Sequence, residues 1–82
     1  MGLDELIREG ECYLRDGHYT EFGDYYINNT IGYAEWTAKS LMLLQSLYPT
    51  HPQTNRFDFW VKRNRADKDE CGHLIGILKA FY

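Results

Sequence analysis

The chain has 82 residues, of which 44% are hydrophobic and 16% aromatic, and its formal net charge at pH 7 is −3. This length predicts one small domain with a thin core, because such a fold hides only about 60% of the surface that its unfolded chain exposes. The apolar content excludes a disordered chain. A mean hydropathy of −0.54 without a long uncharged apolar run excludes a membrane span. The acidic balance argues against general binding to nucleic acids.

Apolar residues at helical spacing predict a first helix over residues 3–16. Asp4 and Glu5 suit the positive end of its dipole, and Gly17 is placed to end it as a left-handed cap. This start of the sequence is acidic and lacks the basic region of a signal peptide. The two cysteines, Cys12 off the apolar stripe and Cys71 within a later one, are therefore expected to be free thiols in a reducing cytoplasm.

Residues 18–32 break the helical period and form an insert rich in aromatic and β-branched residues. Gly23 and Asp24 lie between two such runs, which indicates a hairpin that pairs residues 19–22 with residues 25–28. An ordered loop is the alternative. The tyrosines of the insert are typical of a recognition surface, or they cover the open end of a helical bundle.

The second helix is expected over residues 33–47, where apolar side chains including Leu47 share one broad face and Pro49 stops the helix. Residues 50–53 are typical of a capping box with Thr50 as the cap, so a third helix is expected over residues 51–64. Asp67 followed by Glu70 predicts the cap of a last helix over residues 68–81. The sequence therefore predicts a mainly α fold, a compact bundle of about four helices in one domain over residues 1–82, with the insert after the first helix.

The sequence does not support catalysis, a metal or a cofactor. His18, His51 and His73 lie far apart, and Cys71 and His73 are two positions apart, which does not place both on one helix face. No phosphate-binding loop occurs. The acidic residues lie at expected helix starts or on polar faces, where capping and solubility explain them. A small helical chain also has little room for a walled pocket.

The charge distribution points to a ligand site on the third helix. Residues 1–24 carry a net charge of −5 and residues 56–65 a net charge of +3. Phe59 falls opposite the buried stripe of this helix, between Arg56 and Arg63. An exposed aromatic ring can stack on a planar group while neighbouring guanidiniums hold a phosphate. The candidate ligand-binding residues are Arg56, Phe59, Lys62, Arg63 and Arg65, with Tyr25 and Tyr26 of the insert as stacking partners. The alternative is that Phe59 packs beneath the insert, or that these basic residues pair with the acidic first helix.

Small residues at intervals of four, Gly72, Gly76 and Ala80, form a strip on the last helix. Glycine inside a helix costs about 1 kcal/mol relative to alanine, so two at this spacing indicate that another backbone approaches closely. The insert or a second subunit would cover the strip. We favour a homo-oligomer, because a small chain gains much stability from association.

Four segments carry a resemblance: Gly32-Tyr33-x-x-Trp36-x-x-Lys39, Leu43-Leu44, Tyr48-Pro49-x-His51-Pro52-Gln53-Thr54-x-x-Phe57 and Leu74-Ile75-Gly76-Ile77-Leu78-Lys79. They resemble small uncharacterised helical proteins of phages and mobile elements, and are loosely similar to helical modules ahead of TIR-like effector domains in bacterial antiphage proteins. The resemblance implies a non-catalytic binding protein of the host cytoplasm that sequesters a nucleotide immune signal, such as a cyclic nucleotide. The alternative that it implies is an anti-CRISPR-like module that docks on a host defence effector or nuclease.

Overall fold

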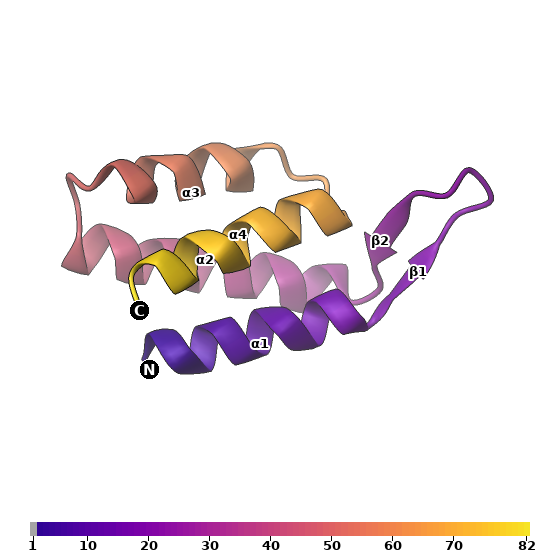
Figure 1. Ribbon diagram of the computed structural model, residues 1–82, viewed down its shortest axis with the longest axis horizontal. Helices are drawn as coiled ribbons and strands as arrows, with labels where there is room; N and C mark the ends of the chain where they lie inside the picture. The colour runs from indigo at the N-terminus through magenta and orange to yellow at the C-terminus, as the bar shows by residue number, and fades with distance from the viewer. Residues whose placement is uncertain (1) are drawn as a thin grey trace.

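The computed structural model describes residues 2–82, in which four helices follow one another with a two-stranded hairpin between the first and the second (Figure 1). The mainly helical fold that the sequence predicts is confirmed. The helices are α1 (Leu3–Arg15), α2 (Thr30–Leu47), α3 (Pro52–Lys62) and α4 (Lys68–Ala80), and the strands are β1 (Gly17–Tyr19) and β2 (Tyr25–Ile27). Among the described residues, no helix is long and apolar enough to cross a membrane.

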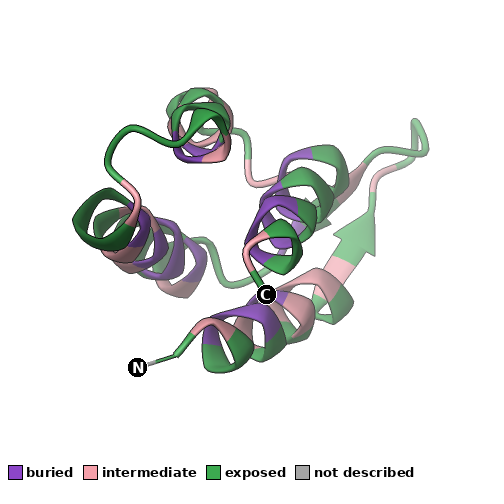
Figure 2. Ribbon diagram, turned by 60° about the vertical axis from the view of Figure 1, so that its left-hand side comes forward, coloured by how far each residue is buried: buried purple, intermediate pink, exposed green. Residues whose placement is uncertain are grey.

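Each helix packs on two neighbours. Helix α4 lies against α1 and α3, and α2 lies against the same two, so the four form a ring when the bundle is viewed from near its end (Figure 2). Trp36 is fully buried in the centre, where its indole N–H donates a hydrogen bond of 2.9 Å to the carbonyl of Leu6. The core consists of Leu6, Ile7, Ile27, Tyr33, Trp36, Leu44, Phe57, Cys71, Leu74, Ile75, Ile77 and Leu78.

The insert is a hairpin that extends beyond the bundle (Figure 1). Strands β1 and β2 are antiparallel, with Gly17 opposite Ile27 and Tyr19 opposite Tyr25, so residues 20–24 form the turn. The sequence predicts either an ordered loop or a hairpin that pairs residues 19–22 with residues 25–28 across a two-residue turn. The structure has the hairpin, but with shorter strands and a longer turn. Ile27 enters the core, and its amide N–H donates a hydrogen bond of 2.8 Å to the carbonyl of Ala66. We call residues 17–27 the aromatic hairpin.

Several helix ends differ from the sequence prediction. Helix α1 ends at Arg15, and Gly17 begins β1 without a left-handed backbone. A side chain at Gly17 would meet the chain itself, because its Cβ would lie 2.6 Å from the carbonyl oxygen of Tyr26. Helix α2 begins three residues earlier than expected, since Asn29 accepts a hydrogen bond of 2.9 Å from the N–H of Gly32.

The start and end of α3 are also corrected. The cap is His51, not Thr50, and its Nδ1 accepts a hydrogen bond of 3.1 Å from the N–H of Gln53. The helix ends at Lys62, two residues before the predicted end, because Asn64 takes a positive φ of 51° that a helix does not allow. Leu47, expected on the buried face of α2, is 55% exposed.

The predicted cap of α4 is confirmed. A carboxylate oxygen of Asp67 accepts a hydrogen bond of 2.8 Å from the N–H of Glu70. The helix ends at Ala80, one residue before the predicted end. The predicted difference between the two thiols is also confirmed, since Cys12 is exposed and Cys71 is buried.

Candidate functional site

The basic face of α3 carries the first group of candidate ligand residues. Phe59 is 65% exposed, as its position on the helix predicts, so it does not pack beneath the hairpin. Two of the basic groups are engaged with their own helix. The ammonium of Lys62 lies 2.9 Å from a carboxylate oxygen of Asp58, and the guanidinium of Arg63 lies 4.5 Å from the ring centre of Trp60. Arg56 is exposed on α3, and Arg65 is exposed in the loop that follows the end of α3, so the structure does not place Arg65 on this helix.

Trp60 is the centre of a stack that sequence reasoning missed. The His73 ring of α4 lies parallel to it at 4.0 Å, and Phe59 meets it edge-on at 6.2 Å. The ring nitrogen Nδ1 of His73 lies 2.7 Å from the carbonyl oxygen of Asp69, and since a carbonyl only accepts, this nitrogen donates. The Trp60 ring is thus engaged by both His73 and Arg63, whereas Phe59 is the exposed aromatic side chain on α3.

Tyr25 and Tyr26, the expected stacking partners, lie on the aromatic hairpin. The hydroxyl of Tyr25 donates a hydrogen bond of 2.7 Å to the carbonyl of Leu14 on α1, and its ring meets Tyr19 at 4.9 Å. Tyr26 forms a β-bridge with Asp67. Contacts with α1 and with the residue before α4 therefore hold these two tyrosines. The cavity that they line includes none of the candidate ligand residues from positions 56–65, so the structure does not bring the two groups together in one pocket.

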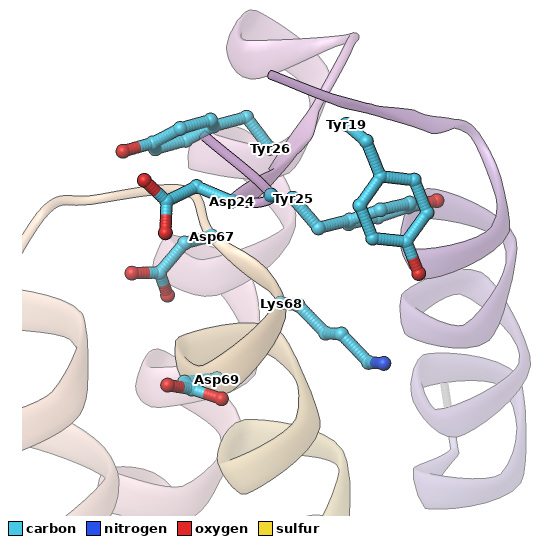
Figure 3. A pocket seen from close by; sticks show the side chains of 8 residues that line it. Tyr19, Asp24, Tyr25, Tyr26, Asp67, Lys68 and Asp69 are labelled. Carbon is cyan, nitrogen blue, oxygen red and sulfur yellow. The ribbon is translucent and has the colours of Figure 1, made fainter. Parts of the chain in front are cut away.

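A cavity of about 260 Å³ lies between the aromatic hairpin and the first turn of α4 (Figure 3). We call it the hairpin cavity. Its lining combines tyrosines with carboxylates and one lysine. In Figure 3 the carboxylates of Asp24 and Asp67 lie on one side of it, near the ring of Tyr26, while the ammonium of Lys68 points to the other side. The lining residues are Tyr19, Gly23, Asp24, Tyr25, Tyr26, Asp67, Lys68 and Asp69.

The small-residue strip of α4 lies on the surface. Gly72, Gly76 and Ala80 are exposed, and a Cβ added at either glycine would have no atom within 4 Å. Neither the hairpin nor another helix of the described chain covers the strip. The strip therefore has room for another backbone that residues 2–82 do not themselves supply.

The acidic first helix pairs with lysines of other helices rather than with the basic face of α3. The Lys39 ammonium lies 2.9 Å from a carboxylate oxygen of Glu9, and the hydrogen bond between them is the main cause that raises the pKa of Lys39. The Lys79 ammonium lies 3.6 Å from a carboxylate oxygen of Glu11. The predicted alternative, in which the α3 arginines neutralise α1, does not occur among the described ion pairs.

Glu70 departs most from what the sequence suggested. It was expected to serve only as a capping or polar-face residue, yet it is 1% exposed. One carboxylate oxygen accepts hydrogen bonds from the hydroxyl of Tyr33 at 2.9 Å and from the N–H of Ala66 at 3.0 Å. Burial, together with the charge of Glu70, raises the pKa of Tyr33. The local signal for Glu70 is that of an ordinary helix start, so its burial was not predictable from spacing.

No cluster of three or more potential metal ligands occurs among residues 2–82. No family model matches the chain, and neither a curated protein nor a solved structure is similar to it. The resemblance to phage proteins therefore stays a prediction. The arrangement of the described residues offers three surfaces: the aromatic hairpin with its cavity, the basic face of α3 and the strip of α4.

Proposed function

We propose that the protein is a non-catalytic interaction module that docks on a partner protein through the aromatic hairpin. The observation that carries the proposal is the exposure of the hairpin's aromatic side chains: Phe22 is 85% exposed, Tyr19 66% and Tyr26 37%. Large aromatic groups gathered on one projecting element are typical of binding surfaces, where they supply contact area at a small cost in conformational entropy. Phe22 lies in the turn, at the end farthest from the bundle.

The fastening of the hairpin supports this proposal. Ile27 is bound to Ala66 through its amide N–H, Tyr26 bridges to Asp67, and Tyr25 is bound to Leu14 through its hydroxyl. These contacts attach the base of the hairpin to the end of α1 and to the segment just before α4. The strand that carries Tyr25 and Tyr26 is thus held in place, which lowers the entropy that binding would cost.

Capture experiments with matched variants test the proposal. We expect the immobilised protein to retain a specific partner from a bacterial lysate, and Phe22→Ser to lose it without a change in melting temperature. Phe59→Ser is the control, because it removes a phenylalanine side chain that is also exposed, but on α3. The proposal is wrong if Phe59→Ser abolishes capture while Phe22→Ser retains it, or if no partner depends on the hairpin. The resemblance would make this partner a host defence effector or nuclease.

A small anionic ligand on the basic face of α3 is a second candidate. It is supported by the open ring of Phe59 beside the exposed Arg56. A base would stack on Phe59, and Arg56 and Arg63 would hold its phosphate. Thermal-shift measurements with cyclic nucleotides and ADP-ribose derivatives test this candidate. A ligand at a hundred times its dissociation constant stabilises a fold by about 2.7 kcal/mol. The rise in melting temperature should disappear in Arg56→Ala. If no nucleotide raises the melting temperature of the unaltered protein, the candidate is wrong.

Self-association through the strip of α4 is proposed on separate grounds. The exposure of Gly72, Gly76 and Ala80 leaves two helical glycines whose cost no contact within the described chain explains. A second copy packed there would explain them. Sedimentation measurements should then show an assembly that Gly76→Glu dissociates. A protein that stays monomeric at high concentration would end this proposal.

A further inference from the structure

We infer that the hairpin cavity binds an arginine side chain of the partner, so that the partner presents a basic segment to the aromatic hairpin. The inference rests on the proposed docking role of the hairpin and adds the chemistry of what docks. Residues 16–28 hold three acidic residues, Asp16, Glu21 and Asp24, and neither lysine nor arginine. This one segment therefore carries as much negative charge as the net charge of the whole chain.

The carboxylates at the cavity have no cation of their own. Within residues 2–82 the ion pairs engage Asp4, Glu9, Glu11 and Asp58, all of them outside the cavity. Asp67 uses one carboxylate oxygen to cap α4, which leaves the other oxygen open. Lys68 also lines the cavity, but its ammonium points away from the carboxylates of Asp24 and Asp67 (Figure 3).

The form of the cavity favours a guanidinium. A planar guanidinium can stack on a tyrosine ring while its N–H groups donate to carboxylates at the ring's edge. Tyr26 and the carboxylates of Asp24 and Asp67 lie on the same side of the cavity (Figure 3), so an aromatic ring and anionic acceptors are within one region of the lining. The volume of about 260 Å³ lies below the range of about 300–1,000 Å³ that is usual for small-molecule sites. It therefore suits a single side chain better than a nucleotide.

The first turn of α4 does not make the cavity a site for an anion. A helix N-terminus attracts negative charge, but here Asp67 caps it and Asp69 and Glu70 lie in its first turn. These carboxylates already complement the dipole. A further anion would meet them as like charges, whereas a cation would be attracted. The charge of the lining and its aromatic rings thus favour the same kind of partner, a basic protein segment.

The test uses a short blocked peptide of alternating arginine and threonine as the probe, titrated into the isotopically labelled protein at low salt. We expect amide resonances of residues 19–27 and 67–69 to shift, and added salt to weaken the binding. The same peptide with lysine in place of arginine should bind more weakly, because an ammonium does not stack as a planar group. Asp24→Asn should weaken binding by about 1.5-fold to fivefold, the usual range for one exposed ion pair. The matched control is Glu5→Gln, which removes the same charge at the far end of α1.

Each contrary result has a defined meaning. If glutamate and glutamine peptides shift the hairpin resonances as strongly as the arginine peptide does, the hairpin docks partners but the assignment of a basic segment is wrong. If the arginine peptide shifts only α1, or if Glu5→Gln weakens binding as much as Asp24→Asn, the cavity is not the site. An acidic partner captured through Phe22 would also overturn the inference while the proposed function stands. Loss of hairpin-dependent capture with intact peptide binding would contradict the proposed function alone.

Discussion

The hydroxyl of Tyr33 donates a hydrogen bond of 2.9 Å to a carboxylate oxygen of Glu70, although 37 positions separate the two residues. The other oxygen of Glu70 accepts a longer hydrogen bond of 3.4 Å from the N–H of Arg65. A buried carboxylate is thus satisfied by neutral donors from α2 and from the loop before α4, with no cation involved. This arrangement joins α2, α4 and the loop that holds the aromatic hairpin.

Truncation of Glu70 should therefore destabilise the fold more than removal of one of its donors. Glu70→Ala leaves the hydroxyl of Tyr33 and the N–H of Ala66 buried without an acceptor, and we expect a loss of about 3 kcal/mol in the free energy of unfolding. Tyr33→Phe removes a single hydrogen bond and should cost about 1 kcal/mol. Urea denaturation measures both. Equal losses in the two variants would show that Glu70 does not organise this junction.

Stability should fall as the solution becomes alkaline. Burial is the main cause that raises the pKa of the Cys71 thiol from 9.0 to about 12. The unfolded chain then loses this proton above about pH 9 while the folded protein keeps it, so the stabilisation is complete below pH 9 and is lost as the pH rises towards about 12. A shift of this size corresponds to at most about 4 kcal/mol. Burial also raises the pKa of Tyr33, so the ionisation of this tyrosine likewise lowers the free energy of unfolding as the pH rises.

Unfolding midpoints in urea, measured across this pH range, check the expectation. Cys71→Ala removes the titrating group and should flatten the decline, whereas Cys12→Ala at the exposed thiol should leave it unchanged. If stability declines equally steeply with pH in both variants, groups other than Cys71 cause the loss of stability at alkaline pH.

The two thiols should differ in their rate of modification. Cys12 is exposed, whereas Cys71 is fully buried with its Sγ 3.6 Å from the carbonyl oxygen of Gly10. A disulfide reagent should modify one thiol of the native protein quickly and the second only at the rate at which the chain opens. Cys12→Ser should abolish the fast phase. Rapid modification of both thiols in the native protein would contradict the packing of α4 on α1.

Two helical glycines should respond in opposite ways to alanine. A Cβ at Gly10 would lie 2.8 Å from Cη2 of Trp36 and 3.1 Å from Cγ1 of Ile75, and the Trp36 ring is fully buried and cannot move aside cheaply. Gly10→Ala should therefore destabilise the fold in spite of its better helix propensity. Gly76→Ala meets open space and should stabilise the monomer by roughly 0.5–1 kcal/mol. Thermal unfolding of both variants at low concentration measures the contrast. A gain in stability for Gly10→Ala would contradict the close approach of α1 to Trp36.

Local signals in the sequence predicted the parts of the fold that depend on neighbouring residues. The cap at Asp67 follows from spacing along one helix and is confirmed. Spacing placed Phe59 opposite the buried stripe but left open whether it packs beneath the insert, and the structure shows it exposed. The hairpin register does not follow from the Gly23-Asp24 signal. The N–H of Gly23 instead donates to the carbonyl of Thr20 at 3.0 Å, within a longer turn. Contacts distant in sequence, Tyr25 with Leu14 and Ile27 with Ala66, bind the hairpin in its observed position.

The candidate site was only partly predictable for the same reason. Composition left open whether the tyrosines of the insert form a recognition surface or cover the open end of the bundle. Their neighbours depend on where β2 meets the start of α4. The bridge between Tyr26 and Asp67 brings together residues that are 41 positions apart in the printed sequence. No local pattern encodes that bridge, so the hairpin cavity and its carboxylates came only from the three-dimensional arrangement.

The loop before α4 has a mechanical consequence. Asn64 and Ala66 hold φ angles of 51° and 52°, in a region that residues other than glycine rarely occupy. The carbonyl of Ala66 also accepts a hydrogen bond from the N–H of Ile27, and the N–H of Ala66 donates one to a carboxylate oxygen of Glu70. A force applied at the tip of the hairpin would thus reach the buried carboxylate through one backbone position. A load on the hairpin would therefore act on the backbone that positions Glu70, so its resistance to bending would depend on the packing of the bundle.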